Sequence, residues 1–244
     1  MMEYCSFSNV GSREVNEDAL LCFAEGNCAC FAVADGLGGH GRGEVASQTV
    51  LGAVEDSLDA LPQEAELTVH LANVFEKAQQ TLLEKQAELH AQLEMKTTLT
   101  VLYIHGNQLC WGHIGDSRLY AFRNNQIAVR TLDHSVPQML AMSGELPERK
   151  IRNHPDRNLL LRVMGIEWDG QPYELSDIYG LDEFQAFLLC SDGFWELIPE
   201  RKMCALLKKS HSAEEWLEHM TAVLEKNGRK REMDNYSAIA VFAT

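Results

Sequence analysis

The sequence predicts an α+β protein in which two antiparallel β-sheets pack together between α-helices, a four-layer αββα sandwich. Strand-length apolar segments follow one another through short connections containing Gly or Asn, which is typical of antiparallel pairing. The long amphipathic segments are grouped instead of alternating with single strands, which disfavours a parallel doubly wound sheet. The 244 residues contain no repeat and no linker, so we expect one domain spanning 1–244.

The first part of the chain predicts three strands followed by two helices. The strands lie around Tyr4–Phe7, Ala19–Phe23 and Cys28–Ala34, where short apolar runs are bounded by turn-forming residues. Apolar residues at helical spacing predict one helix from Glu44 to Leu61 and a longer one over 64–95.

The rest of the chain predicts mainly strands, with two further helices. Four strands between 97 and 132 have short connections and predict an antiparallel meander. Residues 135–165 combine helical and loop character. Three later strands are predicted at 171–179, 185–192 and 235–243. Two amphipathic helices, Pro199–Lys209 and Ala213–Lys226, are predicted before the last of these strands. Ser212, with Glu215 three residues later, predicts the start of the last helix.

Composition excludes several classes of protein. With 36 acidic and 21 basic residues the formal charge is −15, which argues against a general nucleic-acid binder. No apolar run approaches the ~18 residues that a membrane helix needs, and the first residues lack the pattern of a secretory signal. Seven cysteines without a framework predict buried thiols in a reducing compartment, so we expect a cytoplasmic protein with no membrane partner.

Acidic residues at strand ends predict the chemistry of the protein. Five separate strand termini carry a carboxylate: Glu17-Asp18, Asp35, Asp116, Asp192 and Asp234. Converging carboxylates are costly unless protons or cations neutralise them. No His or Cys stands at these termini, so the set predicts all-oxygen ligands for magnesium or manganese, not zinc.

The order of these motifs and the residues in them resemble those of the metal-dependent protein serine/threonine phosphatases of type 2C, the PPM family, in their compact bacterial form. The resemblance covers nearly the whole chain, and its motifs are specific in combination. They are Gly11-Ser12-Arg13, Asn16-Glu17-Asp18, Ala34-Asp35-Gly36-Leu37-Gly38-Gly39-His40, Thr97-Thr98-Leu99, Gly115-Asp116-Ser117-Arg118, Asp133-His134-Ser135, Ser191-Asp192-Gly193 and Asp234-Asn235. The run from Ser143 to Gly165 resembles the flap of the family, so we expect a flap subdomain at about 136–165.

The resemblance implies hydrolysis of phosphoserine and phosphothreonine on proteins. The attacking water or hydroxide bridges two divalent metal ions, Mn(II) or Mg(II), and no covalent enzyme intermediate forms. The implied partners are phosphorylated proteins made by a cognate serine/threonine kinase, with no nucleic acid, and the implied state is a monomer.

The resemblance also implies the metal ligands. Asp35 bridges both ions, and the backbone carbonyl of Gly36 binds one of them. Asp192 and Asp234 hold the other ion, and Glu17 reaches the ion on the Gly36 side through water.

Further roles follow from the same motifs. Asp116 joins Asp192 around a third, weaker ion, and Asn235 orients Asp234 or the final turn. Asp18 orients water or Arg13. Arg13 binds the substrate phosphate through two parallel hydrogen bonds, its alternative being a surface salt bridge to Glu14 or Glu17.

One position departs from the family pattern. The eukaryotic members carry a His directly after Asp-Gly, proposed as the general acid, and this chain has Leu37 there. His40, in the same loop, is a candidate for that acid, and a metal-bound water is the alternative.

Two other functions are compatible with parts of the sequence. A pseudophosphatase would keep the fold and bind phosphoproteins without turnover, but the full set of carboxylates favours activity. A metal-dependent nuclease or nucleotide phosphohydrolase is disfavoured by the charge, and GLGGHGRG lacks the lysine and hydroxyl of a P-loop.

Overall fold

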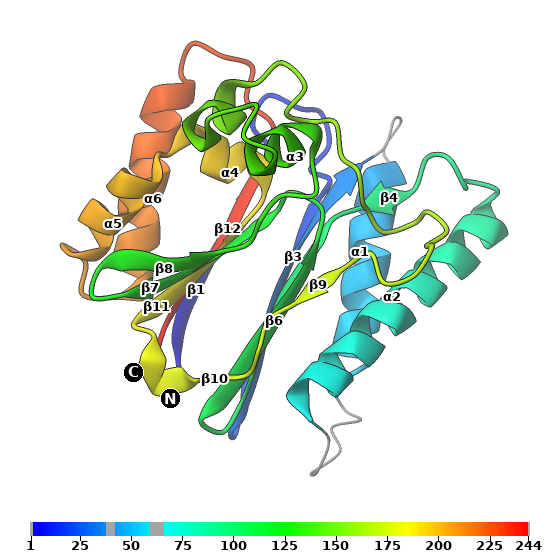
Figure 1. The fold of residues 1–244 in the computed structure, drawn as a ribbon, viewed down its shortest axis with the longest axis horizontal. Coiled ribbons are helices and arrows are strands. Elements are labelled where there is room, and N and C mark those ends of the chain that lie inside the picture. Colours follow the sequence, from blue (N-terminus) through cyan, green and yellow to red (C-terminus); the bar gives the residue numbers. More distant parts are fainter. Residues whose placement is uncertain (1, 38–41, 59–65, 244) are drawn as a thin grey trace.

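The computed structural model describes residues 2–37, 42–58 and 66–243 and confirms the predicted fold class. Two antiparallel sheets pack face to face, and helices cover both outer sides (Figure 1). In the described residues no helix is long and apolar enough to cross a membrane.

One sheet has five strands and carries three helices. Its order is β1 (Glu3–Asn9), β12 (Tyr236–Phe242), β11 (Ala186–Cys190), β7 (Arg118–Arg123) and β8 (Gln126–Arg130). The helices on its outer face are α4 (Asp192–Leu197), α5 (Glu200–Leu207) and α6 (Ala213–Gly228).

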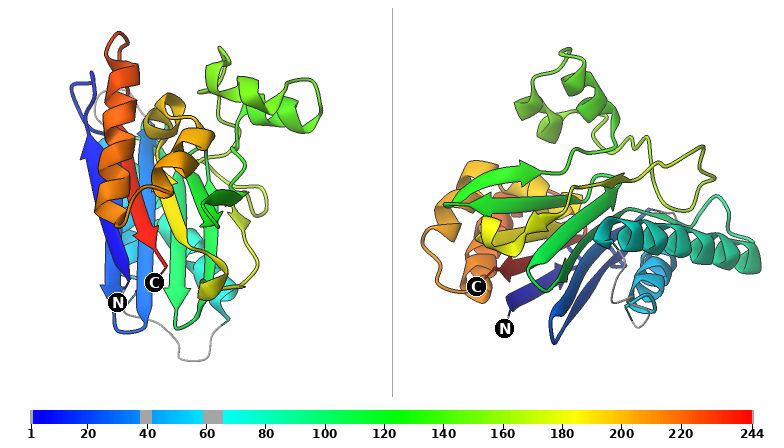
Figure 2. Two further views of the ribbon diagram at one scale, coloured as in Figure 1. Left: turned by 90° about the vertical axis from the view of Figure 1, so that its left-hand side faces the viewer. Right: turned by 60° about the horizontal axis from the view of Figure 1, so that its bottom comes forward.

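The other sheet has seven strands and carries two long helices. Its main order is β10 (Tyr179–Gly180), β6 (Gln108–Ile114), β5 (Leu99–His105), β3 (Cys28–Leu37) and β2 (Asp18–Glu25), with β4 (Lys96–Thr97) beside β3 and β9 (Glu174–Leu175) beside β6. The helices are α1 (Arg42–Glu55) and α2 (Leu67–Leu89). Between β8 and β9, α3 (Val136–Met142) and the 3₁₀ helix η1 (Glu148–Asn153) stand out from the sandwich (Figure 2).

The predicted meander over 97–132 is wrong in one respect, because the chain changes sheet between β6 and β7. The hairpins β5–β6 and β7–β8 belong to different sheets. The physical reason is burial: β6 and β7 are apolar on both faces, and stacked layers cover both faces where a single exposed meander could not. The crossing occurs at Gly115-Asp116-Ser117, which places a carboxylate between the sheets.

Other boundaries also differ from the predictions. Helix α1 ends at Glu55, and residues 59–61 of the predicted helix lie outside the described residues. Helix α2 ends at Leu89, because His90 takes a left-handed conformation that terminates the helix. The segment 171–179 forms only two short strands, with the Ser176 side chain accepting from the Trp111 N–H in place of a strand bond.

The last helix begins as predicted, with the Ser212 side chain accepting from the N–H of Glu215 at 3.0 Å. A short helix that the sequence analysis did not predict, α4, begins at Asp192 directly after β11. Of the seven thiols predicted to be buried, four are buried and three are half-buried: Cys30, Cys110, Cys190 and Cys204, against Cys5, Cys22 and Cys28.

Three apolar layers hold the sandwich together. The central layer lies between the sheets and includes Phe31, Leu102, Trp111, Phe187 and Ile239. Outer layers join each sheet to its helices. Each fully buried large side chain contributes about 1.5–3 kcal/mol through removal of apolar surface from water.

A buried ion pair ties β7 to the segment after β8. The Arg118 guanidinium donates to both carboxylate oxygens of Asp133 at 2.7 Å, and both side chains are at least 96% buried. Two parallel hydrogen bonds in this geometry compensate for much of the lost hydration.

Removal of this carboxylate is therefore expected to destabilise the fold. We predict that Asp133→Ala lowers the free energy of unfolding by about 3–5 kcal/mol, because Arg118 is left charged and buried. Urea denaturation of the purified proteins measures this. The matched control is Glu183→Ala, which breaks an exposed pair with Arg123 and is expected to cost less than about 1 kcal/mol. Equal losses in the two variants would contradict the prediction.

Candidate active site

The predicted carboxylates converge at one end of the sandwich, and strand direction explains why. Strands β3 and β6 are both antiparallel to β5, so Asp35 at the end of β3 and Asp116 after β6 lie at the same edge. Strands β11 and β12 are antiparallel neighbours, so Asp192 after β11 and Asp234 before β12 also share an edge. Asp18, at the start of β2, pairs directly with Asp35.

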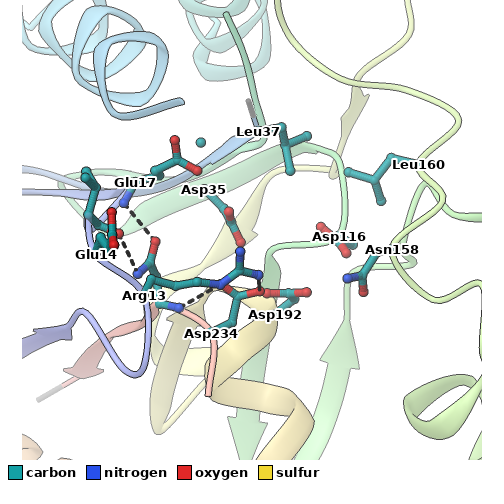
Figure 3. A pocket seen from close by; sticks show the side chains of 13 residues that line it. Arg13, Glu14, Glu17, Asp35, Leu37, Asp116, Asn158, Leu160, Asp192 and Asp234 are labelled. Carbon is teal, nitrogen blue, oxygen red and sulfur yellow. Dashed lines mark hydrogen bonds and ion pairs between the residues drawn. The ribbon is translucent and has the colours of Figure 1, made fainter. Parts of the chain in front are cut away.

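A cavity of about 590 Å³ opens at this edge, and acidic side chains dominate its wall. Figure 3 shows carboxylates from both sheets pointing into one space, with Arg13 reaching across it. The lining residues are Arg13, Glu14, Val15, Glu17, Asp35, Gly36, Leu37, Asp116, Asn158, Leu160, Asp192, Asp234 and Asn235.

The backbone of Asp35 is held by two threonines, which leaves its carboxylate for the cavity. Its N–H donates to Thr98 Oγ1 at 3.0 Å, and its carbonyl accepts from the Thr98 N–H and the Thr97 hydroxyl, each at 2.9 Å. The two threonine hydroxyls and the Thr98 backbone thus position Asp35, and neither threonine lines the cavity.

Gly36 stands where two backbones approach too closely for a side chain. A Cβ here would lie 2.2 Å from the Gly43 carbonyl oxygen and 2.7 Å from that of Glu17. The Gly36 N–H donates to the Glu17 carbonyl at 3.0 Å. Glycine therefore brings Glu17 and the first turn of α1 against the end of β3.

Asp116 lies in the turn where the chain crosses between sheets. Gly115 has φ +103°, and a Cβ there would lie 2.5 Å from the Thr98 side chain. The Asp116 carbonyl accepts from the indole N–H of Trp195 at 2.9 Å, so the backbone is fixed and the carboxylate is 5% exposed in the cavity wall.

Asp234 and Arg13 form the ion pair at the mouth of the cavity. The Arg13 guanidinium donates to Asp234 Oδ2 at 2.7 Å, and the Arg13 side chain stays 59% exposed. The structure thus pairs Arg13 with Asp234 instead of with Glu14, Glu17 or Asp18. An exposed guanidinium beside the acidic cluster is available to an anion.

Asn235 organises the loop around Glu17. Its amide Oδ1 accepts from the Glu17 N–H at 2.8 Å, and its Nδ2 donates to the carbonyls of Val10 and Val15. Its own N–H donates to Asp234 Oδ1 at 2.9 Å. One side chain therefore links the last turn to the motif that carries Arg13 and Glu17.

Asp18 sits behind the cavity and does not line it. Its Oδ2 accepts from the Ser191 hydroxyl at 2.7 Å, and its Oδ1 is buried with no hydrogen-bond partner among the described residues. Burial raises the pKa of Asp18 to about 7, with Asp192 and Asp234 adding to the effect.

Burial and mutual repulsion raise the pKa of the other carboxyl groups as well. Burial raises the pKa of Asp192 to about 6, and the neighbouring charge of Asp234 contributes. The pKa of Asp35 and of Asp116 is raised well above the usual value, first by burial and then by the surrounding aspartates. Burial also raises the pKa of Glu17.

This donor set fits hard divalent cations. Ionised together, the carboxylates repel one another in a desolvated cavity, so either protons or cations must neutralise them. All the acidic ligand atoms are oxygen, and Asp18 Oδ1 leaves a buried acceptor unsatisfied, as expected beside an ion and its water. Magnesium or manganese matches these ligands better than zinc.

A histidine cluster elsewhere is less suited to a metal. His113, His134 and Glu174 bring their ligand atoms within 4.8 Å of one another. However, His134 Nδ1 accepts from the Gly115 N–H, so the neutral ring carries its proton on Nε2. His113 Nε2 lies 2.8 Å from the Leu132 carbonyl and must donate to it. His134 therefore has no free lone pair for a metal, and in this cluster only Nδ1 of His113 and the Glu174 carboxylate could serve as ligands.

Three residues in the run 157–160 lie at the site, although the sequence analysis assigned them no role there. Asn158 and Leu160 line the cavity, and Arg157 Nη1 lies 3.9 Å from Asp192 Oδ2 and forms an ion pair with Glu196. The Arg-Asn pair in this run was a signal, but only the folded chain brings it over the site. His40 lies outside the described residues, and Leu37 lines the cavity at the position after Gly36.

Comparisons with known proteins point to one family. A family model described as protein phosphatase 2C matches residues 7–236. The chain is 33% identical to a serine/threonine phosphatase (stp) of Listeria welshimeri, over 83% of this chain and 81% of the relative. It is 32% identical to the serine/threonine protein phosphatase PstP of Mycobacterium tuberculosis, over 88% of this chain and 40% of that protein.

Solved structures show the same similarity in three dimensions. A bacterial serine phosphatase superimposes with a TM-score of 0.89 at 27% identity, covering 100% of this chain and 98% of that one. The catalytic domain of PstP in complex with two manganese ions gives a TM-score of 0.80 at 26% identity, covering 99% of this chain and 97% of that domain.

The raised pKa values predict how the metal-free protein responds to pH. Between the ordinary aspartate pKa of about 4 and the values of about 6 for Asp192 and about 7 for Asp18, the folded state binds more protons than the unfolded state. The free energy of unfolding of the chelated protein should therefore fall as the pH rises through this window. Urea denaturation across the window measures it.

A matched pair of variants tests the assignment to the cavity. Asp192→Asn removes one of the titrating groups and should make the pH dependence of stability shallower. Asp169→Asn removes an exposed carboxylate and should leave it unchanged. Stability that rises with pH in the chelated wild-type protein would contradict the prediction.

Proposed function

This chain belongs to the protein phosphatase 2C family and is a metal-dependent protein serine/threonine phosphatase, and on that premise we propose how its residues carry the reaction. The observation that carries this proposal is the convergence of buried carboxylates from both sheets on one cavity.

We assign the ligands to the residues that line this cavity. The carboxylates of Glu17, Asp35, Asp116, Asp192 and Asp234 and the backbone carbonyl of Gly36 would hold two Mn(II) or Mg(II) ions and a third, more weakly bound one. When bound, such ions activate water as a nucleophile and stabilise charge on the phosphoryl oxygens. Phosphate monoesters hydrolyse very slowly without catalysis, so this electrostatic stabilisation is the main requirement.

Arg13 binds the phosphate of the substrate. Its guanidinium is held by one bond to Asp234, which leaves further N–H donors for phosphate oxygens. Asn158 offers an amide at the opposite wall, and Leu37 and Leu160 limit access of bulk water. The bond between Asp234 and Arg13 aligns the guanidinium with the reacting group.

Asp18 acts from behind the ligands. The Ser191 hydroxyl fixes one of its oxygens, and the other is a free acceptor. It orients water in the cavity and, with Asp35 beside it on the neighbouring strand, contributes to the negative charge that attracts cations.

The general acid is assigned to His40 as a proposal that a single variant tests. With Leu37 after Gly36, no histidine follows the Asp-Gly pair directly. Undiminished rates of His40→Ala on both an aryl phosphate and a phosphopeptide would remove His40 from the mechanism, because the aryl leaving group needs no acid whereas the seryl alkoxide does.

The substrates are proteins phosphorylated on serine or threonine by a cognate kinase, and the enzyme acts as a cytoplasmic monomer with one catalytic domain over 1–244. The flap subdomain, 136–165, selects among them, because α3 and η1 project beside the cavity and the same segment supplies Asn158 and Leu160. A pseudophosphatase that only binds phosphoproteins is the alternative. The complete set of carboxylates disfavours it.

Loss of any central ligand should abolish turnover without unfolding the protein. We predict that Asp35→Asn, Asp192→Asn and Asp234→Asn each lower kcat/KM on a phosphopeptide by at least about 100-fold with manganese present. Isothermal titration calorimetry with manganese and circular dichroism accompany the assay, so that lost metal binding is separated from misfolding.

Asp169→Asn is the matched control, since it makes the same change at an exposed position. It should keep wild-type activity and metal affinity. A central variant that retains wild-type turnover with its ions bound would show that the carboxylate concerned is not a ligand.

Arg13 should matter for phosphate and not for metal. Arg13→Ala removes charge-assisted hydrogen bonds worth about 1.5–3 kcal/mol, so kcat/KM on a phosphopeptide should fall by about 10–100-fold while manganese affinity persists. Arg13→Lys should recover little, because an ammonium cannot form two parallel bonds. Arg123→Ala breaks an exposed pair far from the cavity lining and serves as control. An unchanged kcat/KM would exclude Arg13 from phosphate binding.

A further inference from the structure

A second cavity, lined mainly by arginines, lies outside the acidic site. It measures about 630 Å³ and lies between the flap helix η1, the start of α5 and the hairpin β7–β8. Five arginines and two glutamates account for its charged lining: Arg118, Arg130, Arg149, Arg152, Arg201, Glu148 and Glu200. This excess of positive charge is unusual in a chain of formal charge −15.

Internal ion pairs neutralise only part of this charge. Arg118 pairs with Asp133 as described and lies 3.3 Å from Glu200, to which Arg152 donates at 2.6 Å. Arg130 donates to Glu148 at 2.5 Å and lies 3.6 Å from Asp133, so three carboxylates face five arginines. The other two arginines that line this cavity, Arg149 and Arg201, are exposed and form no ion pair in the described part of the chain.

Two of the paired arginines also keep unused donors. Arg130 Nη1 and Arg152 Nη1 are buried and have no hydrogen-bond partner among the described residues, the nearest carboxylate oxygen to Arg130 Nη1 being Asp133 Oδ1 at 3.6 Å. Their side chains are only 12% and 17% exposed, so water reaches them poorly. A buried donor without an acceptor is costly, and an oxyanion in the cavity would supply acceptors.

We propose that this arginine cavity binds a phosphate group. Phosphate offers several strong acceptor oxygens and two negative charges near neutral pH, which suits guanidinium groups that converge from η1, α5 and β8. The phosphate belongs either to a protein substrate with more than one phosphorylated residue or to free phosphate, the product of the reaction; the first source rests on the proposed function.

The cavity is physically linked to the active site. The Arg118 guanidinium stacks on the Trp195 ring at 3.5 Å from its centroid, and the indole N–H of Trp195 donates to the Asp116 carbonyl. Its other wall, η1, belongs to the segment that continues to Asn158 and Leu160 over the acidic cavity. A phosphate held here would contact η1, part of the same segment that lines the acidic cavity.

Calorimetry with inorganic phosphate on the chelated full-length protein tests binding without turnover. Variants in each cavity separate phosphate binding at the arginine cavity from binding at the acidic cavity. We expect Arg149→Gln/Arg201→Gln to bind phosphate at least about tenfold more weakly than wild type, and Arg13→Gln to retain phosphate binding at the arginine cavity. Neither Arg149 nor Arg201 forms an ion pair in the described residues, so the fold should persist, and circular dichroism verifies it.

The matched control is Arg229→Gln/Lys230→Gln, which makes the same charge change on exposed residues outside both cavities. It should leave phosphate affinity unchanged. Equal affinity in wild type and the Arg149/Arg201 variant, or binding that Arg13→Gln abolishes, would overturn the proposal. Because this measurement uses metal-free protein, its outcome is independent of the proposed catalytic ligands.

Kinetics with metal present identify the source of the phosphate. A KM raised several-fold by Arg149→Gln/Arg201→Gln for a doubly phosphorylated peptide, but not for its singly phosphorylated counterpart, assigns the cavity to the substrate. Equal KM values with the loss of phosphate binding seen by calorimetry assign it to free phosphate.

Discussion

The arrangement of the active-site end is governed by the cost of placing several carboxylates in one desolvated cavity. Burial raises the pKa of Asp35, Asp116 and Asp192, and neighbouring carboxylates raise it further: Asp192 acts on both Asp35 and Asp116, and Asp234 acts on Asp192. The fold bears this cost by satisfying the backbone around each carboxylate, so that the side-chain oxygens remain for cations. Thr98 holds Asp35, and Trp195 holds Asp116. Cations bound in this cavity would replace protons as the neutralising charges and would thereby stabilise the fold.

The sandwich supplies what this arrangement needs, namely strands from two sheets that end at one edge. A single sheet would place its terminal carboxylates in a row about 5 Å apart. Two stacked sheets surround a cavity instead. The crossing at Gly115, with its positive φ, and the close approach at Gly36 bring backbone nearer than side chains would allow. Glycine at these two positions is therefore part of the site.

Arginine side chains lie at two places near the active-site end, namely the acidic cavity and the arginine cavity. Arg13 faces the acidic cavity and pairs with Asp234. A second group of arginines lines the arginine cavity, where Arg118 stacks on Trp195. There Arg118 and Arg152 both donate to the same carboxylate oxygen of Glu200. Glu200 consequently has a lowered pKa, although burial opposes this, because the Arg152 and Arg118 charges favour its ionised form. The flap meets the sandwich at this cluster, because Arg152 of η1 donates to Glu200 at the start of α5.

The sequence by itself determined the fold class, the family resemblance and the candidate ligands, because alternating apolar runs and strand-end carboxylates are local patterns. Ser212 could likewise be recognised as a helix cap from four residues. The change of sheet between β6 and β7 could not be predicted from the sequence. Both strands are apolar on both faces, so pairing within one sheet and separation into two sheets satisfy the local pattern equally well. The partner of Arg13 and the position of Asn158 were also decided only by tertiary structure, because each depends on residues distant in sequence that packing brings together.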